Sequence, residues 1–280
     1  MRIVLCALIA LMPAAVPAAA QTAAAEPEYL KDRGPGVATS MFGTYVRKGE
    51  LLFYPFFEWY ADRNFEYTPG ELGYRADGEY RGRYRGSEGL LFLGYGLTNN
   101  LALEFEAAVI SAALTKSPLD SSIVPPRVKE SGLGDVEMQV RWRVAEERAT
   151  RPEVFTYFET VFPFQRDRRL IGTPDWEHKI GVGFTRGLSW GTMTFRAAAD
   201  YTRAERKWDA GEYAIEYLKR LSPKWRVVAG LEGNQLDEVA LITEAQWHFH
   251  RRAFLKLNNG LGLTTNATDV APEIGLMIAF

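Results

Sequence analysis

A two-residue alternation of apolar and polar side chains recurs along most of this chain and restricts the possible folds more than any other feature. It is clearest at 101–109, where apolar residues take every odd position and two glutamates lie among the even ones. At 132–144, valine, methionine and tryptophan alternate with acidic, amide and basic residues. Because successive side chains of a β-strand point to opposite faces, both segments are predicted to be strands with one apolar and one polar face.

Segments of this kind predict an all-β fold, an antiparallel transmembrane up-and-down β-barrel of about 12 strands. The expected strands are 51–60, 87–96, 101–109, 132–144, 153–162, 176–186, 191–201, 211–220, 225–233, 239–249, 253–263 and 271–280. Short connections (97–100, 145–151, 187–190, 221–224, 250–252) alternate with generally longer ones (61–86, 111–130, 163–175, 202–210, 234–238, 264–270). Tight periplasmic turns and longer outer loops are typical of outer-membrane barrels.

The last expected strand, 271–280, ends the chain on Phe280. Its isoleucines, its leucine and the terminal phenylalanine share one face, and Met277 is out of pattern. A strand with no successor leaves an unpaired edge, which is a hazard for aggregation. Pairing between this strand and the first one removes that edge and closes the barrel.

The N-terminal residues have the pattern of an export signal. Arg2 precedes an apolar run at 3–12, and small residues follow as far as Ala20. This arrangement predicts a cleaved signal peptide at 1–20, a flexible or periplasmic lead-in at 21–48 with a short strand at 40–46, and the barrel at 49–280. No run of about 18 apolar residues follows the signal, so helical membrane spans are not expected. The expected location is the outer membrane of a Gram-negative bacterium.

The tryptophans are sorted by strand end. Four lie beside short connections (Trp142, Trp190, Trp225, Trp247) and three near the longer ones (Trp59, Trp176, Trp208). Indole rings prefer the headgroup level of a bilayer, so two rows at opposite strand ends indicate two aromatic girdles. A soluble β-sandwich would also alternate, but it would not need this sorting. The lipid bilayer is therefore the first expected partner.

The polar faces are expected to line the barrel lumen and to carry most of its charge. The candidate solute-pathway residues are Glu104, Glu106, Asp135, Glu137, Arg141, Arg143, Glu212, Glu216, Arg220, Arg226, Glu232, Glu238, Glu244 and Lys256. One interpretation is a lumen that selects solutes by charge and hydrogen bonding. The other is a lumen filled by paired side chains, since eight strands are just filled and 16–18 leave a channel. Twelve strands predict a narrow or partly plugged pore.

Composition and residue types weigh against other function classes. A formal net charge of -2 does not indicate nucleic-acid binding. The single cysteine, Cys6, lies in the expected signal peptide, so the mature chain would have no thiol. Only His248 and His250 share a strand face, fewer ligands than zinc requires. No metal or other cofactor is expected. His178 is expected on the lipid face, near Trp176.

Four stretches carry a family resemblance: SGLGDVEMQVRW (131–142), RPEVFTYFETVFP (151–163), GEYAIEYLKRLSP (211–223) and the terminal APEIGLMIAF. They resemble the outer-membrane transporter family grouped with the MetA pathway of phenol degradation, over most of the mature chain. The resemblance implies an outer-membrane barrel with a role in solute passage and no catalytic residues. With the polar inner face, it leads us to expect a monomeric channel for passive passage of small solutes, hydrophobic or aromatic ones among the candidates.

Two alternatives stay open. A structural or adhesive barrel without transport would bind partners through 61–86 and 111–130, and the Arg/Tyr pattern of 75–85 would serve that role or fold inward as a plug. A membrane-embedded lipid hydrolase would need a histidine within reach of a serine. No serine lies at the same-face position next to His248 and His250, and no G-x-S-x-G elbow occurs, so an enzyme is not expected.

Overall fold

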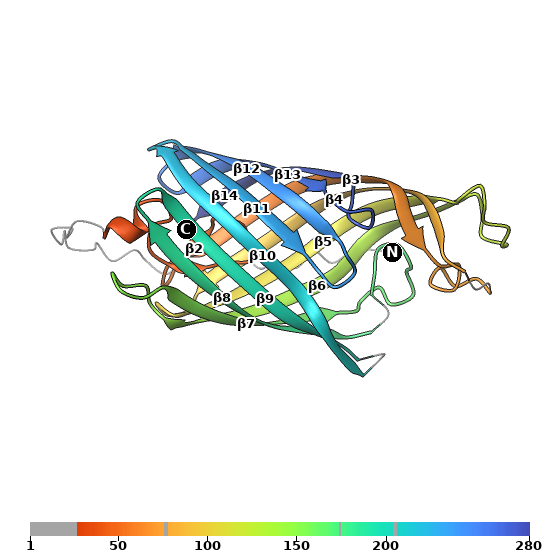
Figure 1. The fold of residues 1–280 in the computed structure, drawn as a ribbon, viewed down its shortest axis with the longest axis horizontal. Helices are drawn as coiled ribbons and strands as arrows, with labels where there is room; N and C mark the ends of the chain where they lie inside the picture. Colours follow the sequence, from red (N-terminus) through yellow and green to blue (C-terminus); the bar gives the residue numbers. More distant parts are fainter. Residues whose placement is uncertain (1–26, 76–77, 174, 204–205) are drawn as a thin grey trace, which may run out of the picture.

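Twelve antiparallel strands close into one barrel, which confirms the expected fold class. The computed structural model describes residues 27–280 apart from 76–77, 174 and 204–205, so the expected signal peptide lies outside the described residues. Each strand from β3 to β14 pairs with its neighbours in the chain, and β14 pairs with β3 (Figure 1). The strands are β3 (Leu51–Tyr67), β4 (Tyr80–Gly96), β5 (Leu101–Thr115), β6 (Arg127–Ala145), β7 (Glu153–Phe162), β8 (Glu177–Leu188), β9 (Gly191–Thr202), β10 (Lys207–Ser222), β11 (Trp225–Gly233), β12 (Val239–His250), β13 (Ala253–Gly262) and β14 (Val270–Ala279).

Three of the long connections are shorter than expected, because strands continue through them. One is the expected loop 202–210, where β10 already begins at Lys207. The expected loop 61–86 is a connection at 68–79, and the expected loop 111–130 is one at 116–126. Rings inside the β3–β4 extension stack on each other: the centroids of Phe65 and Tyr84 are 4.7 Å apart. Residues 80–85, part of the segment considered as an inward plug, belong to β4. Because polar residues occupy both faces of these extensions, the sequence shows no alternation of apolar and polar residues there, and the strands were not predicted.

Two prolines lie in the strands that close the barrel. Between β14 and β3 the registered partners skip Pro55 and Pro272, although pairs exist on either side of each. Pro55 keeps Leu91 as its partner on β4, and Pro272 keeps Asn259 on β13. Proline has no N–H to donate to a neighbouring strand. At both positions the missing donor faces the seam between β3 and β14, so the pairing of each proline with its other neighbouring strand is kept. The closing seam therefore loses hydrogen bonds at two points.

Large apolar side chains cover the outside of the barrel. Val109 is 62% exposed, Trp142 53% and Phe57 50%. An apolar surface of this extent is unfavourable in water and favourable in hydrocarbon, and apolar-out, polar-in strands are typical of outer-membrane barrels. Six of the seven tryptophans are exposed. Five of these lie at or beside strand ends as expected, whereas Trp59 lies in the middle of β3, because that strand continues beyond its expected end. Among the described residues, no helix is long and apolar enough to cross a membrane.

Aromatic rings of β7 lie over glycines of β8. Tyr157 pairs with Gly181 and is buried, and a Cβ added at Gly181 would overlap its ring. We expect Gly181→Val to lower the free energy of unfolding by about 1–3 kcal/mol, the usual cost of overpacking. Gly89→Val is the matched control, because its added Cβ meets no atom within 4 Å. Denaturant unfolding in lipid vesicles measures both, and equal losses would contradict the prediction.

Residues 27–50, which we call the inner hairpin, fold inside the barrel at the end with the short connections. Their elements are η1 (Glu28–Leu30), β1 (Val37–Ala38) and β2 (Tyr45–Val46), with β1 and β2 paired antiparallel. Val37 and Val46 are fully buried and pack in one cluster with Leu52, Tyr54 and Met277 of the wall. The lead-in is thus structured wherever the chain is described, and it partly plugs the barrel.

The inner hairpin accounts for two departures from simple alternation. Met277, out of pattern in β14, faces inward and is 2% exposed. Segment 51–60 is apolar on both faces, and its inward Tyr54 and Phe56 belong to the same cluster as the hairpin valines. A barrel lumen is normally polar because it meets water. Here the wall is apolar on both faces where its inner side meets protein.

Candidate functional site

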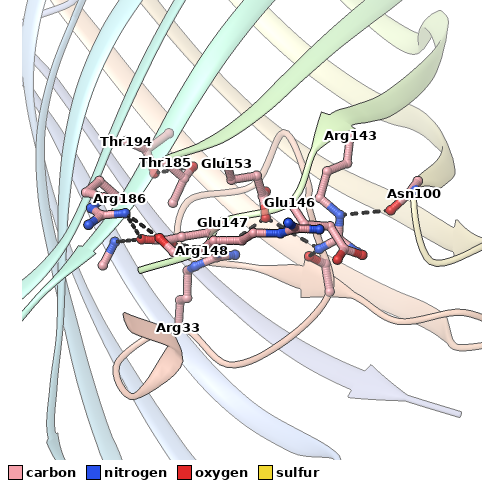
Figure 2. A network of polar contacts seen from close by, with 12 residues as sticks. Arg33, Asn100, Arg143, Glu146, Glu147, Arg148, Glu153, Thr185, Arg186 and Thr194 are labelled. Atoms are coloured by element: carbon pink, nitrogen blue, oxygen red, sulfur yellow. Dashed lines mark hydrogen bonds and ion pairs between the residues drawn. The ribbon is translucent and has the colours of Figure 1, made fainter. Parts of the chain in front are cut away.

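Arg33 joins the inner hairpin to the barrel wall through two carboxylates (Figure 2). Its Nη2 lies 3.1 Å from Oε2 of Glu147 and 3.1 Å from Oε2 of Glu153, and all three side chains are at most 1% exposed. Arg143 adds a second link, with Nη1 2.7 Å from the carbonyl oxygen of Gly36 and 3.4 Å from Glu153. Removing one partner of a buried ion pair leaves an uncompensated charge, so these contacts hold the hairpin strongly.

Glu147 lies in the connection between β6 and β7 and ties it to β8. Its Oε1 accepts a hydrogen bond of 2.8 Å from the Gly187 N–H. Burial raises the pKa of Glu147, and the Gly187 N–H and the Arg33 guanidinium act in the opposite direction. This carboxyl therefore joins the hairpin, a short connection and a strand.

The turn of the inner hairpin reaches the middle of the barrel. Ser40 donates its N–H (3.0 Å) and its hydroxyl (2.7 Å) to Oε2 of Glu104. Oε1 of Glu104 pairs with Nε of Arg141 at 3.2 Å. The Phe42 ring centroid lies 5.3 Å from Cζ of Arg196, a cation–π distance. Wall charges on several strands thus converge on this turn.

A cavity of about 480 Å³, which we call the chamber, lies beyond the hairpin turn, and Ser40 and Met41 form part of its lining. The wall contributes eight carboxylates and three cations: Glu106, Glu137, Glu159, Glu177, Asp200, Asp209, Glu212, Glu232, Arg141, Lys179 and Arg196. A cleft lined mainly by one sign of charge concentrates ions of the other sign. The excess of carboxylates therefore favours cations over anions in the chamber.

Three wall cations, of which Lys256 is buried and the other two are half-buried, are each shared between two carboxylates on nearby strands. Lys179 lies 3.2 Å from Glu159 and 2.6 Å from Glu212, Arg196 pairs with Glu216 at 3.8 Å and with Glu232, and Lys256 lies 3.1 Å from Glu244 and 3.7 Å from Glu273. Each group links neighbouring strands of the wall. Each retains one excess negative charge when all its members are ionised.

Glu106 and Glu137 differ from these groups. They lie directly opposite each other on β5 and β6, and both line the chamber. Within the described chain, neither has a hydrogen-bond or ion-pair partner. Like charges directly opposite across a strand pair are destabilising. A pair kept without a structural partner is therefore the best candidate for direct contact with a solute.

The predicted lumen residues take different places. Glu104, Arg141 and Arg143 hold the inner hairpin; Glu106, Glu137, Glu212 and Glu232 line the chamber; Glu216, Glu244 and Lys256 belong to the shared-cation groups; and Arg220 and Arg226 line a second cavity, of about 220 Å³, beside the hairpin. Asp135 accepts hydrogen bonds from Gln165 and Thr173 of the connection 163–176. The placement of Glu238 was wrong, because it lies in the exposed connection 234–238 and bonds to Asn234.

Several inward charges were missed in the sequence, namely Glu58, Glu88, Glu159, Lys179, Arg196 and Glu273. All lie at inward positions of strands, so counting two residues at a time from a known inward residue would have found them. Arg33 carried no such signal, because the inner hairpin is too short to show a period.

Each of the three histidines has its own hydrogen-bond partner. His178 faces outward and stacks on Phe158, as expected for the lipid face. His248 bonds to the Gln246 side-chain oxygen at 3.0 Å, and His250, the last residue of β12, accepts a hydrogen bond from the Arg252 N–H. Within the described residues, no three candidate ligands come together.

Comparisons with known structures show which barrels this fold resembles. No protein-family profile matches the chain, and no curated protein is significantly similar in sequence. An outer membrane channel from Pseudomonas putida F1 has a similar structure, with 14% identity, TM-score 0.58, and coverage of 83% of this chain and 96% of that one. The KdgM porin in complex with oligogalacturonate is also similar, with 7% identity, a TM-score of 0.52, and coverage of 81% of this chain and 99% of that one. The translocator domain of the autotransporter NalP from Neisseria meningitidis is similar with 11% identity, a TM-score of 0.50, and coverage of 83% of this chain and 89% of that one.

These similarities show the fold. Together with the apolar outer surface, they define a twelve-stranded β-barrel of the outer membrane of Gram-negative bacteria. By the usual rule for such barrels, the end with the short connections, where the inner hairpin lies, faces the periplasm.

Proposed function

We propose that this protein is a monomeric outer-membrane channel for the passive passage of small solutes. The observation that carries the proposal is the chamber, a polar cavity of about 480 Å³ at mid-barrel. The inner hairpin narrows the route to the periplasm, but cavities of about 220 Å³ and 410 Å³ flank it. Barrels of about eight strands are filled by side chains, whereas this barrel retains space on both sides of its plug.

Charge is the main selectivity element that we infer. The chamber has an excess of carboxylates, whereas the 220 Å³ cavity is lined by Arg33, Arg47, Arg220 and Arg226. A solute would meet a negative region first and a positive one beyond it. Small cations would enter the chamber more readily than small anions. Passage of hydrophobic or aromatic solutes stays a prediction, supported by the family resemblance.

Three aromatic compounds of nearly equal size test both points: benzylammonium, benzyl alcohol and benzoate. We expect benzylammonium to permeate better than benzoate in planar-bilayer recordings, and reversal potentials measure the ratio. Benzyl alcohol flux into vesicles, corrected for protein-free vesicles, tests uncharged aromatic solutes. Glu106→Gln with Glu137→Gln should lower the cation-to-anion permeability ratio several-fold.

The matched control is Glu79→Gln with Asp167→Asn, which removes two exposed carboxylates from the long connections. It should leave the ratio unchanged. A wild-type protein without conductance and without solute flux would contradict the channel and favour a structural or adhesive barrel.

We also infer that the protein acts by passage and not by catalysis. A lipid hydrolase of this fold would need a serine activated by a histidine. The observed side-chain partners of His178 and His248 are Thr160 and Gln246. Membership in the transporter family that the chain resembles is part of this proposal. Lipid-ester hydrolysis by purified protein, lost on changing His178 or His248, would contradict it.

A further inference from the structure

The outward face of β4, β5 and β6 changes character towards the end with the long connections. One register row is apolar, with Gly89, Val109 and Leu133 in line. The next row consists of three serines in register, Ser87, Ser111 and Ser131, and Trp59 of β3 continues it. The following rows bring Arg85 and Lys129, and then Arg83 and Arg127, to the same face. Apolar, hydroxyl and cationic rows thus succeed one another.

The cations of this face have no partner among the described residues. Arg85, Arg127 and Lys129 are exposed, and within the described chain none makes a side-chain hydrogen bond or ion pair. Glu130, the carboxylate beside them, accepts hydrogen bonds from the N–H groups of Arg169 and Leu170 at 2.9 and 2.8 Å. The Glu130 carboxylate therefore binds the backbone of the connection 163–176 and does not neutralise the positive charge of the cations on this face.

These residues form a groove. A cavity of about 510 Å³ is lined by Trp59, Arg85, Ser111, Lys129, Arg127 and Arg168, among others. Arg168 belongs to the connection 163–176, which the bonds to Glu130 hold beside β6. Four cations therefore surround a hollow whose floor is made of small residues, next to a tryptophan at the level of the headgroups.

We infer that this groove binds the phosphorylated headgroup of an anionic glycolipid of the outer leaflet, the lipid A part of lipopolysaccharide. Position favours a lipid over a soluble anion, because the groove lies on the lipid-facing surface directly above the apolar row. Arginines recognise phosphate through charge-assisted hydrogen bonds, and the serine hydroxyls can contact the sugars. Trp59 lies where it can contact the start of the acyl chains.

The test uses the full mature protein in detergent, freed of lipid, with EDTA present. Native mass spectrometry would titrate it with bisphosphorylated lipid A, with fully dephosphorylated lipid A, and with inorganic phosphate as a competitor. The test variant is Arg127→Gln with Lys129→Gln. Its matched control is Arg203→Gln with Arg206→Gln, which removes two other exposed arginines at the same end of the barrel.

We expect bisphosphorylated lipid A to bind the wild-type protein. The test variant should bind it about thirtyfold more weakly, because each of the two removed cations contributes about fivefold to the affinity for an anionic headgroup. The control variant should bind like the wild type, and heat-dependent gel mobility should show both variants folded. Equal weakening in the two variants, or equal binding of dephosphorylated lipid A, would overturn the inference. Competition by inorganic phosphate at concentrations as low as those of lipid A would also overturn it, since it would indicate a site for a free ion.

Discussion

Replacing Arg33 with glutamate should release the inner hairpin and raise the single-channel conductance several-fold. The substitution would place three carboxylates together, because Glu147 and Glu153 both lie 3.1 Å from the guanidinium that it removes. Breaking a buried ion pair costs about 3–5 kcal/mol. This is enough to release the inner hairpin from the barrel wall, because its two-residue strands contribute little stability of their own. Planar-bilayer recording measures the conductance.

Lys224→Glu is the matched control, since it replaces a cation by a carboxylate in an exposed turn at the same end of the barrel, outside the cavities that line the route. Its conductance should stay at the wild-type value. Hydrogen exchange of residues 27–50 should rise only in the Arg33 variant. An Arg33→Glu protein with wild-type conductance and unchanged protection would show that the hairpin is not held by this charge.

The second large effect concerns stability. Lys256 is 1% exposed, and its ammonium lies between Glu244 at 3.1 Å and Glu273 at 3.7 Å. Lys256→Met would leave two buried carboxylates without a cation, so we expect the free energy of unfolding to fall by about 3–5 kcal/mol. Urea unfolding in lipid vesicles measures this change.

Two further variants distinguish a loss of charge compensation from a loss of packing. Adding Glu244→Gln and Glu273→Gln to Lys256→Met should restore most of the loss, because the uncompensated charge is then gone. Lys224→Met, which removes an exposed lysine from a turn, should have little effect. If the triple variant were no more stable than Lys256→Met, the loss would come from packing and not from charge.

The strand pattern was predictable because alternation reports which face each side chain occupies. The run at 101–109 has the expected pairing, and Glu106 and Glu137 lie on the inner face as expected. The extensions of β3 to β6 were missed because residues such as Arg81 and Tyr84 are polar or amphipathic on both faces, so the two-residue period carries no hydrophobic contrast.

The candidate site was only partly predictable. Positions 104 and 141 could be placed on the inner face, but their contact with each other and with Ser40 could not be inferred from local pattern. The inner hairpin contributes Arg33 and Ser40 from a segment that precedes every barrel strand. Sequence separations of more than 60 residues lie between these groups and their partners.

The sequence by itself determined the number of strands, their two faces, the tryptophan girdles and the closure of the last strand on the first. These are local properties, set by the two-residue period and by which side chains prefer lipid or water. The tertiary structure alone decided where the lead-in lies, which charges pair on neighbouring strands and with the inner hairpin, and how much space remains for a solute. Those features depend on strand register and on contacts between segments far apart in the sequence, and a local period carries no information about either.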